Sequence, residues 1–179
     1  MEITLKSLQI FERMTQETTA FRATLYVDGK GVGEAGNDGQ GGCTWYHAIH
    51  HDFIPIIEKA EEYCKSLPPH EWEYGGKKYS RPSNLEMVID HLVQKLGMEK
   101  QNKKFKAKML KDQKVGVIYG DDKSYEMTYF KGRNGKVPIA EMLSHEATKM
   151  NLKITINKIK KELNPGQRIL NTNLPKEVL

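Results

Sequence analysis

The stretch TTAFRATLYVDGKGVGEA, Thr18–Ala35, decides how the first part of the chain folds. From Phe21 to Val27 apolar and polar side chains alternate, which is the period of a strand with one buried face. Asp28-Gly29 follows, and this dipeptide favours a type I′ turn because glycine takes up a positive φ at little cost. We therefore predict an antiparallel hairpin whose returning strand is Val32–Ala35.

The rest of the chain places strands before helices twice, and this order argues for an α+β fold and against a parallel βαβ sheet. We predict a single α+β domain over residues 1–179, with two antiparallel β-hairpins packed with three to four helices. The other predicted elements are a strand at Ile3–Phe11, a helix with apolar positions from Ile49 to Leu67, a polar loop at Glu71–Pro82, a helix that begins at the capping box Ser83–Glu86, a second hairpin at Val115–Phe130, helices at Val137–Met150 and Leu152–Leu163, and an extended segment at Arg168–Pro175.

Proline makes the start of the first helix ambiguous. Pro55 falls inside the apolar stripe that runs from Ile49 to Leu67. If the regular helix begins near Asp52, Pro55 lies in a first turn, where its missing N–H needs no partner. The alternative is a helix kinked at Pro55.

Charge is distributed unevenly along the chain, whose formal net charge is +5. Residues 1–90 hold nine Lys/Arg against fourteen Asp/Glu, and residues 91–179 hold nineteen against nine. Much of the positive charge falls within Lys95–Lys114, which predicts a basic amphipathic helix that is partly exposed and protrudes from the fold. Such a face suits nucleic acid or an acidic protein partner, although lysines also simply keep helices soluble. The candidate contact residues are Lys100, Lys103, Lys104, Lys106, Lys108 and Lys111.

The chain concentrates its unusual residues in NDGQGGCT, Asn37–Thr44, between the first hairpin and the first predicted helix. Successive backbone N–H groups just ahead of a helix N-terminus form a site for an anion. The alternative is a turn that needs positive φ at several glycines. On the first interpretation the candidate ligand-binding residues are Asn37, Asp38, Gly39, Gly41, Gly42, Cys43, Thr44 and His47.

Three histidines, His47, His50 and His51, follow this loop, and two of them lie four and eight residues after Cys43. A continuous helix would align Cys43, His47 and His51 at i, i+4 and i+8 along one face, where a thiolate and two imidazoles are suitable ligands for zinc. A metal-dependent hydrolase or nuclease using His47, His50, His51 and Asp52 is therefore an alternative function. Pro55 and the glycines argue against a helix there, which leaves surface or capping histidines. We predict no metal, no cofactor and no catalytic residue, and for Cys43 a structural role over a nucleophilic one.

Composition bears on the cellular compartment in which we expect the protein. No apolar run approaches the ~18 residues of a membrane span, so no membrane partner is expected. The N-terminus lacks the basic-then-apolar layout of a signal peptide. With two cysteines, Cys43 and Cys64, a disulfide framework is disfavoured, and we expect a cytoplasmic protein with reduced thiols. Cys64 lies on the apolar stripe of its helix and is predicted to be buried.

Three stretches, Ala23–Lys30, Asn37–Cys43 and Ile169–Pro175, carry a resemblance to small uncharacterised proteins of bacteriophages and gut bacteria. The similarity spans most of the chain and brings no activity with it. It implies an accessory phage-type protein acting in a bacterial cytoplasm. By analogy with such proteins, we expect a non-enzymatic binding protein that sequesters a nucleotide-like ligand or blocks a host defence or nucleic-acid-handling complex. Non-specific DNA or RNA binding through the basic half is a further alternative.

Overall fold

The computed structural model describes all residues, 1–179, and the chain divides into two compact units, unit 1 (Met1–Lys100) and unit 2 (Gln101–Leu179). Each unit has its own hydrophobic core, which differs from the single domain that we predicted over residues 1–179. The stretch 98–111, around the boundary between the units, contains no buried residue, so the pattern of buried positions along the chain is interrupted there. The predicted α+β class is confirmed, with four α-helices and antiparallel sheets.

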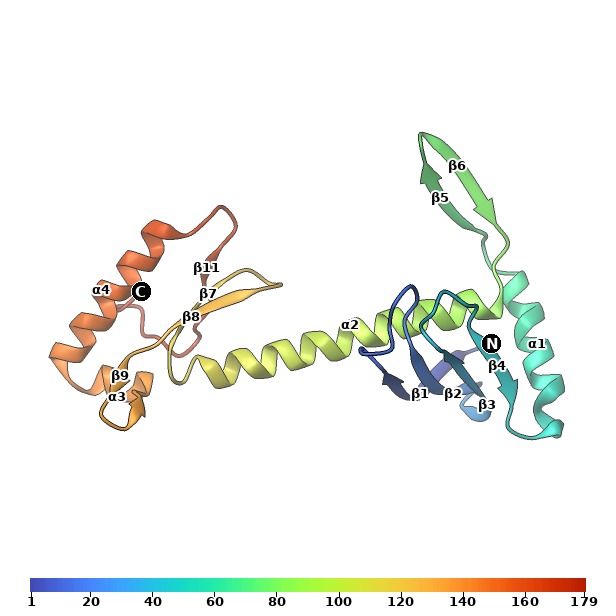
Figure 1. Cartoon of the computed structure of the whole chain (residues 1–179), viewed down its shortest axis with the longest axis horizontal. Helices are drawn as coiled ribbons and strands as arrows, with labels where there is room; N and C mark the ends of the chain where they lie inside the picture. The colour runs from blue at the N-terminus through green and yellow to red at the C-terminus, as the bar shows by residue number, and fades with distance from the viewer. The chain divides into compact units, whose positions relative to one another are not determined.

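Unit 1 contains an antiparallel meander of four strands in the order β1-β2-β3-β4, drawn in blue to cyan in Figure 1. The predicted hairpin is confirmed, because β2 pairs with β3 across a turn in which Asp28 and Gly29 both have positive φ. The first predicted strand is confirmed as β1. The glycine loop leads into strand β4 and not into a helix, so that prediction is wrong. The strands are β1 (Ile3–Ile10), β2 (Phe21–Val27), β3 (Lys30–Asn37) and β4 (Trp45–Ala48).

A short 3₁₀ helix, η1 (His51–Phe53), and helix α1 (Ile54–Lys65) follow β4. Pro55 lies in the first turn of α1, which confirms the first of the two predicted arrangements. Helix α2 (Leu85–Asp112) begins one residue later than the predicted capping box requires. The Asn84 side chain accepts the hydrogen bond from the Met87 N–H at 2.8 Å, so Asn84 caps this helix.

The core of unit 1 forms between the sheet and both helices. Phe21 and Leu25 of β2 pack in one apolar cluster with Ile57 of α1 and with Leu85 and Ile89 of α2, so α1 and the beginning of α2 cover the same face of the sheet. Burying an aliphatic or aromatic side chain of this size contributes about 1.5–3 kcal/mol. Cys64 is buried in the same cluster, as predicted.

Between α1 and α2 the chain forms a second hairpin, β5 (His70–Tyr74) and β6 (Lys77–Arg81), which pairs with no other strand. The predicted polar loop at Glu71–Pro82 is therefore wrong. Gly75 and Gly76 occupy the turn with φ of 59° and 74°, as a two-residue hairpin turn demands. All ten strand residues are exposed. Aromatic residues do alternate with polar ones around Trp72, Tyr74 and Tyr79, and Gly75-Gly76 is a hairpin-turn dipeptide, so the sequence carried a strand signal that our prediction missed.

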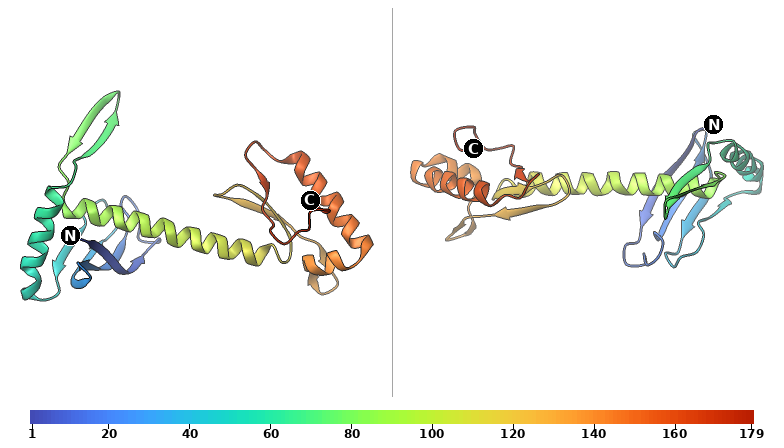
Figure 2. Two further views of the ribbon diagram at one scale, coloured as in Figure 1. Left: turned by 180° about the vertical axis from the view of Figure 1, so that it is seen from behind. Right: turned by 90° about the horizontal axis from the view of Figure 1, so that it is seen from above.

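Helix α2 continues without interruption through Gly97 into the predicted basic segment (Figure 2). The six candidate lysines from Lys100 to Lys111 are all exposed, which confirms a partly exposed basic helix. Its amphipathic character is visible within unit 2. The Phe105 ring meets the Tyr125 ring edge to face with centroids 5.4 Å apart, and the Tyr125 hydroxyl donates to Asp112 at 2.8 Å. Partial burial and this hydrogen bond raise the pKa of Tyr125 to about 12.

Unit 2 confirms the second predicted hairpin, as β7 (Val117–Gly120) pairs with β8 (Tyr125–Thr128) and also with β11 (Arg168–Ile169). A two-residue ladder, β9 (Lys131–Gly132) with β10 (Gly135–Lys136), follows. The predicted helix Val137–Met150 is divided, because His145 is extended with φ of −125°. Helix α3 (Ile139–Ser144) precedes that residue, and α4 (Glu146–Glu162) contains most of the last predicted helix.

The core of unit 2 includes Leu152 and Ile156 of α4 with Val117 of β7 and Ile139 of α3. Beside it, Asn171 is buried and joins three parts of the unit. Its Oδ1 accepts the Ile118 N–H at 2.6 Å, and its Nδ2 donates to the Gly116 carbonyl at 3.0 Å and to the Gln113 carbonyl at 3.4 Å. The extended C-terminal segment is thus held to β7 by a side chain.

None of the helices combines the length and the apolar character that crossing a membrane requires.

Candidate ligand-binding cleft

A cleft of about 650 Å³ in unit 1 brings the glycine loop together with the first turns of α2 and the base of the β5–β6 hairpin. We call it the loop cleft. Its volume lies in the range of small-molecule sites. Five of the eight predicted ligand-binding residues line it: Asn37, Gly41, Gly42, Cys43 and Thr44. The other three, Asp38, Gly39 and His47, do not.

Asn37 organises the loop from inside. It is buried, and its Oδ1 accepts hydrogen bonds from the Thr18 hydroxyl and the Gly39 N–H, both at 2.8 Å. Its Nδ2 donates to the Gly42 carbonyl at 2.8 Å. One side chain therefore ties both ends of the loop to the turn before β2, which fixes the wall of the loop cleft.

The loop amides are arranged differently from an anion nest at a helix N-terminus. The Gly41 N–H donates to the Thr18 hydroxyl at 3.2 Å, and the Gly39 N–H donates to Asn37. The residues that follow form β4, so the loop does not lead into a helix N-terminus. Gly39 and Gly41 both have φ of +86°, which agrees with the alternative interpretation of a turn that needs glycine.

The remaining predicted ligand residues lie elsewhere on unit 1. Asp38 forms an exposed ion pair with Arg22 at 3.2 Å. His47 lies on β4, where its ring stacks on Trp45 with centroids 5.2 Å apart and its Nε2 is 3.8 Å from a Glu34 carboxylate oxygen. Gly39 belongs to the loop but does not line the loop cleft, and its carbonyl accepts the Gln16 N–H at 2.9 Å.

Two carboxylates of α2, Glu86 and Asp90, form the acidic wall of the loop cleft. Glu86 Oε1 accepts the Thr44 N–H at 3.1 Å, and Asp90 Oδ1 accepts the Thr44 hydroxyl at 2.5 Å. The residues are one helical turn apart, so both reach the same threonine. The second oxygen of each carboxylate accepts no hydrogen bond from the protein. These two oxygens are acceptors in the loop cleft, which the Glu17 side chain also lines.

A cation, Arg81, lies at the base of the hairpin, across the loop cleft from the acidic wall. His70 and Arg81 face each other across the β5–β6 pair, and both line the loop cleft. Partial burial raises the pKa of Asp90, as does the nearby Glu86 carboxylate, whereas the Thr44 hydroxyl and Arg81 lower it. The loop cleft therefore combines acceptors on α2 with a guanidinium on β6.

Replacing Asp90 with asparagine tests the effect of pH on this wall. Because burial raises the pKa of Asp90, the folded state holds its proton to a higher pH than the unfolded chain does. Stability is then lost as pH rises between the two pKa values. We expect D90N to unfold at a higher temperature than the wild type at about pH 7, and the difference to shrink at about pH 3, where the carboxyl is protonated.

Circular dichroism melts at both pH values measure this difference. The control is Glu58→Gln, which neutralises an exposed carboxylate of α1. A D90N protein that loses stability at neutral pH but not at acidic pH would contradict the expectation.

The histidine cluster is only partly assembled. Cys43 lies in the loop, His47 in β4 and His51 in η1, so the predicted helical alignment of these three residues is wrong. His50, His51 and Asp52 do come together, with possible ligand atoms all within 4.8 Å of one another, on an exposed surface. His50 Nδ1 also accepts the Asp52 N–H at 3.4 Å, which makes His50 a capping histidine of η1.

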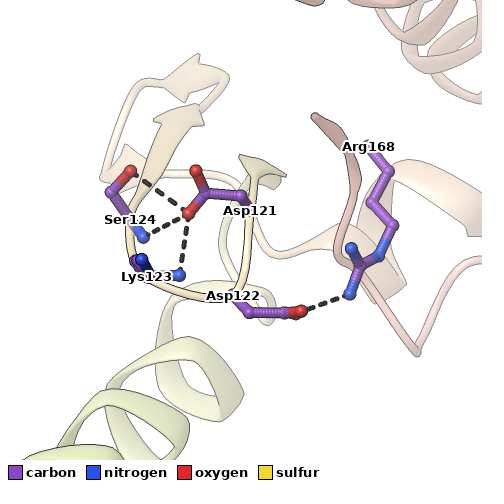
Figure 3. A network of polar contacts seen from close by, with 5 residues as sticks. All are labelled: Asp121, Asp122, Lys123, Ser124 and Arg168. Atoms are coloured by element: carbon purple, nitrogen blue, oxygen red, sulfur yellow. Dashed lines mark hydrogen bonds and ion pairs between the residues drawn. The ribbon is translucent and has the colours of Figure 1, made fainter. Parts of the chain in front are cut away.

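The chain has two pairs of adjacent acids outside the loop cleft, Glu61-Glu62 and Asp121-Asp122, and both have partners within the protein. Glu61 accepts the Tyr46 hydroxyl at 2.8 Å, and burial together with this hydrogen bond raises the pKa of Tyr46. Asp121 accepts the N–H groups of Lys123 and Ser124 at 2.7 and 2.8 Å in the β7–β8 turn (Figure 3). These hydrogen bonds lower the pKa of Asp121. Asp122 instead points to Arg168 of β11, at 2.6 Å.

The six candidate lysines lie on the exposed part of α2, outside the loop cleft. Lys100, Lys104, Lys108 and Lys111 follow one another at spacings of four, four and three residues, so they share one face of the helix. We call this face the lysine face. Lys103 borders it, and Lys106 lies to one side.

The predicted site did not include the other lining residues of the loop cleft, among them His70, Arg81, Glu86 and Asp90. One signal was present, because Glu86 and Asp90 are spaced i, i+4 on a predicted helix. Their pairing with Thr44 bridges more than forty positions of the chain, from Thr44 to Glu86 and Asp90. A local pattern does not encode such a contact.

No protein-family model, no curated protein and no solved structure matches the chain.

Proposed function

We propose that the protein is a non-enzymatic binding protein that sequesters a nucleotide-like ligand in the loop cleft. The observation that supports this most is the meeting of free carboxylate oxygens and a guanidinium across one cleft of about 650 Å³. Glu86 and Asp90 supply the oxygens, and Arg81 supplies the guanidinium. A ligand that carries N–H donors at one end and a phosphate at the other matches both walls.

Each wall has a chemical counterpart in a nucleotide. Carboxylates accept hydrogen bonds from exocyclic amino groups of bases, and arginine binds phosphate through two parallel N–H donors. Asn37 holds the loop wall in place, and a wall ordered before binding lowers the entropic cost of capture. Glu86 and Asp90 already hold Thr44, so their rotamers are fixed as well.

Isothermal titration calorimetry of untagged protein with the four nucleoside monophosphates, the matching nucleosides and inorganic phosphate tests the proposal. We expect the adenine, guanine and cytosine nucleotides to bind more tightly than the uracil nucleotide, because their bases carry an exocyclic amino group. Arg81→Gln removes the phosphate partner and is expected to weaken nucleotide binding about 10- to 100-fold, with little change for nucleosides. Glu86→Gln should act on the base and weaken both classes of ligand.

Lys78→Gln is the matched control, because Lys78 lies on the same hairpin strand as Arg81 and does not line the loop cleft. Thermal melts of each variant show that unit 1 remains folded. Equal affinity of wild type and R81Q for every nucleotide, or no heat with any ligand up to millimolar concentration, would refute the proposed site.

The lysine face favours a second candidate function, non-specific binding of DNA or RNA. Four exposed ammonium groups along one helix face neutralise phosphates without reading sequence, and no acidic residue lies among them on that face. This function involves α2 beyond the core of unit 1 and does not involve the loop cleft.

A further inference from the structure

One face of the β5–β6 hairpin carries only aromatic and cationic side chains. Paired residues of an antiparallel ladder share a face, and successive residues alternate between faces. His70 pairs with Arg81, Trp72 with Tyr79, and Tyr74 with Lys77. These six residues form one face, which we call the aromatic face. The acids Glu71 and Glu73 lie on the other face, with Lys78 and Ser80.

The rings of the aromatic face are ordered but uncovered. Trp72 stacks on Tyr79 with centroids 5.6 Å apart and planes 16° from parallel, and His70 stacks on Trp72 at 5.9 Å. Trp72 is 43 % exposed, Tyr79 41 % and Tyr74 76 %. The cross-strand stack supports a hairpin that has no third strand. Large rings left in contact with water mark an interaction site.

We propose that the aromatic face binds single-stranded nucleic acid. Bases stack on aromatic side chains whatever their identity, and cations next to the rings pair with the phosphates between them. The aromatic face supplies both. Its rings offer surfaces for stacking, and Lys77 and Arg81 supply the cations. The segregation of Glu71 and Glu73 to the other face removes the carboxylates that would repel a polyanion. A duplex, whose bases are already stacked, offers these rings no partner.

The aromatic face is a site distinct from the loop cleft, although the two share His70 and Arg81 at the base of the hairpin. Trp72, Tyr74, Lys77 and Tyr79 do not line the cleft. Variants of these four residues therefore test the aromatic face without touching nucleotide capture, and the failure of one proposal leaves the other standing.

Intrinsic fluorescence gives a direct readout at the site. The chain has two tryptophans, Trp45 and Trp72, so Trp45→Phe leaves Trp72 as the only one. We titrate this variant with a DNA and an RNA single strand of about twelve nucleotides, the length of one single-strand binding site, and with the matching DNA duplex. We expect saturable quenching of Trp72 by the single strands and at least about 10-fold weaker binding of the duplex.

Fluorescence anisotropy with the same labelled oligonucleotides measures the contribution of each residue. Tyr74→Ala and Trp72→Ala are each expected to weaken binding about 10-fold, because each removes one stacking surface. Trp72→Phe keeps a ring in the stack and should retain most of the affinity. Ser80→Ala, on the opposite face of β6, is the matched control and should change nothing.

The lysine face provides the contrasting result. If Lys104→Gln with Lys108→Gln abolishes oligonucleotide binding while Tyr74→Ala and Trp72→Ala leave it unchanged, the aromatic face is not the site. Binding without quenching of Trp72, or equal affinity for duplex and single strand, overturns the proposal as well. The proposal is also overturned if the protein binds no oligonucleotide. If the aromatic face instead binds another protein, the partner belongs to a different class.

Discussion

Replacing Asn171 with alanine is expected to lower the free energy of unfolding of unit 2 by about 3 kcal/mol. The Asn171 side chain is buried and accepts the Ile118 N–H at 2.6 Å while it donates to the Gly116 carbonyl at 3.0 Å. Alanine removes both partners at once. A donor and an acceptor of the backbone around β7 then stay buried without a hydrogen bond, and each such group costs about 1–3 kcal/mol.

Hydrogen exchange of the β7 amides measures this loss. Both tryptophans belong to unit 1, so their fluorescence serves as an internal reference that the substitution should not change. The control is Asn157→Ala, which removes an exposed asparagine of α4 whose side chain makes no hydrogen bond. Equal protection of β7 in the two variants would show that Asn171 contributes little to holding the C-terminal segment.

Replacing Gly39 with alanine is expected to destabilise unit 1 by about 3 kcal/mol. The φ of Gly39 is +86°, a conformation that costs any other L-residue about 1–2 kcal/mol. A Cβ at this position would also collide with the Met14 carbonyl and lie 2.8 Å from the Ala20 side chain. Because the Gly39 carbonyl accepts the Gln16 and Glu17 N–H groups, the loop cannot move aside without breaking these hydrogen bonds.

Gly42→Ala is the matched control in the same loop. Gly42 lies outside the left-handed region, and a Cβ there meets no atom within 4 Å. Urea unfolding followed by tryptophan fluorescence compares the two variants in unit 1. We expect a clear decrease in the midpoint for G39A and a change within about 0.5 kcal/mol for G42A. Similar midpoints for both variants would mean that the loop tolerates a side chain anywhere.

The elements that could be predicted from sequence are those with a local cause. The β2–β3 hairpin follows from the alternation of Phe21–Val27 and from Asp28-Gly29. The start of α1 follows the first of the two arrangements predicted from Pro55, in which proline occupies the first turn. The basic part of α2 follows from its lysines and from Phe105, which packs on one side only.

Other features depend on information that no short window contains. Strand β4 is held by pairing with β3, although its four residues follow three glycines and precede a histidine run. The loop cleft depends on Thr44 reaching Glu86 and Asp90, a contact that only the tertiary fold creates.

Two loop segments, one in each unit, are built in the same way. Asn37–Cys43 begins with a buried asparagine that closes the glycine loop. Ile169–Pro175 contains Asn171, which holds the C-terminal segment to β7. In both cases one amide side chain satisfies several backbone groups that a loop leaves without partners. Asn37 and Asn171 therefore determine how these two segments are held in place.

The lysine face of α2 has a consequence for the helix itself. Lys100, Lys104 and Lys108 stand one turn apart, and like charges at this spacing repel one another and weaken a helix. This part of α2 buries no residue that would offset the repulsion. An anion bound along the lysine face would relieve it and make the helix more rigid. By thermodynamic linkage, a more rigid helix would in turn hold that anion more tightly.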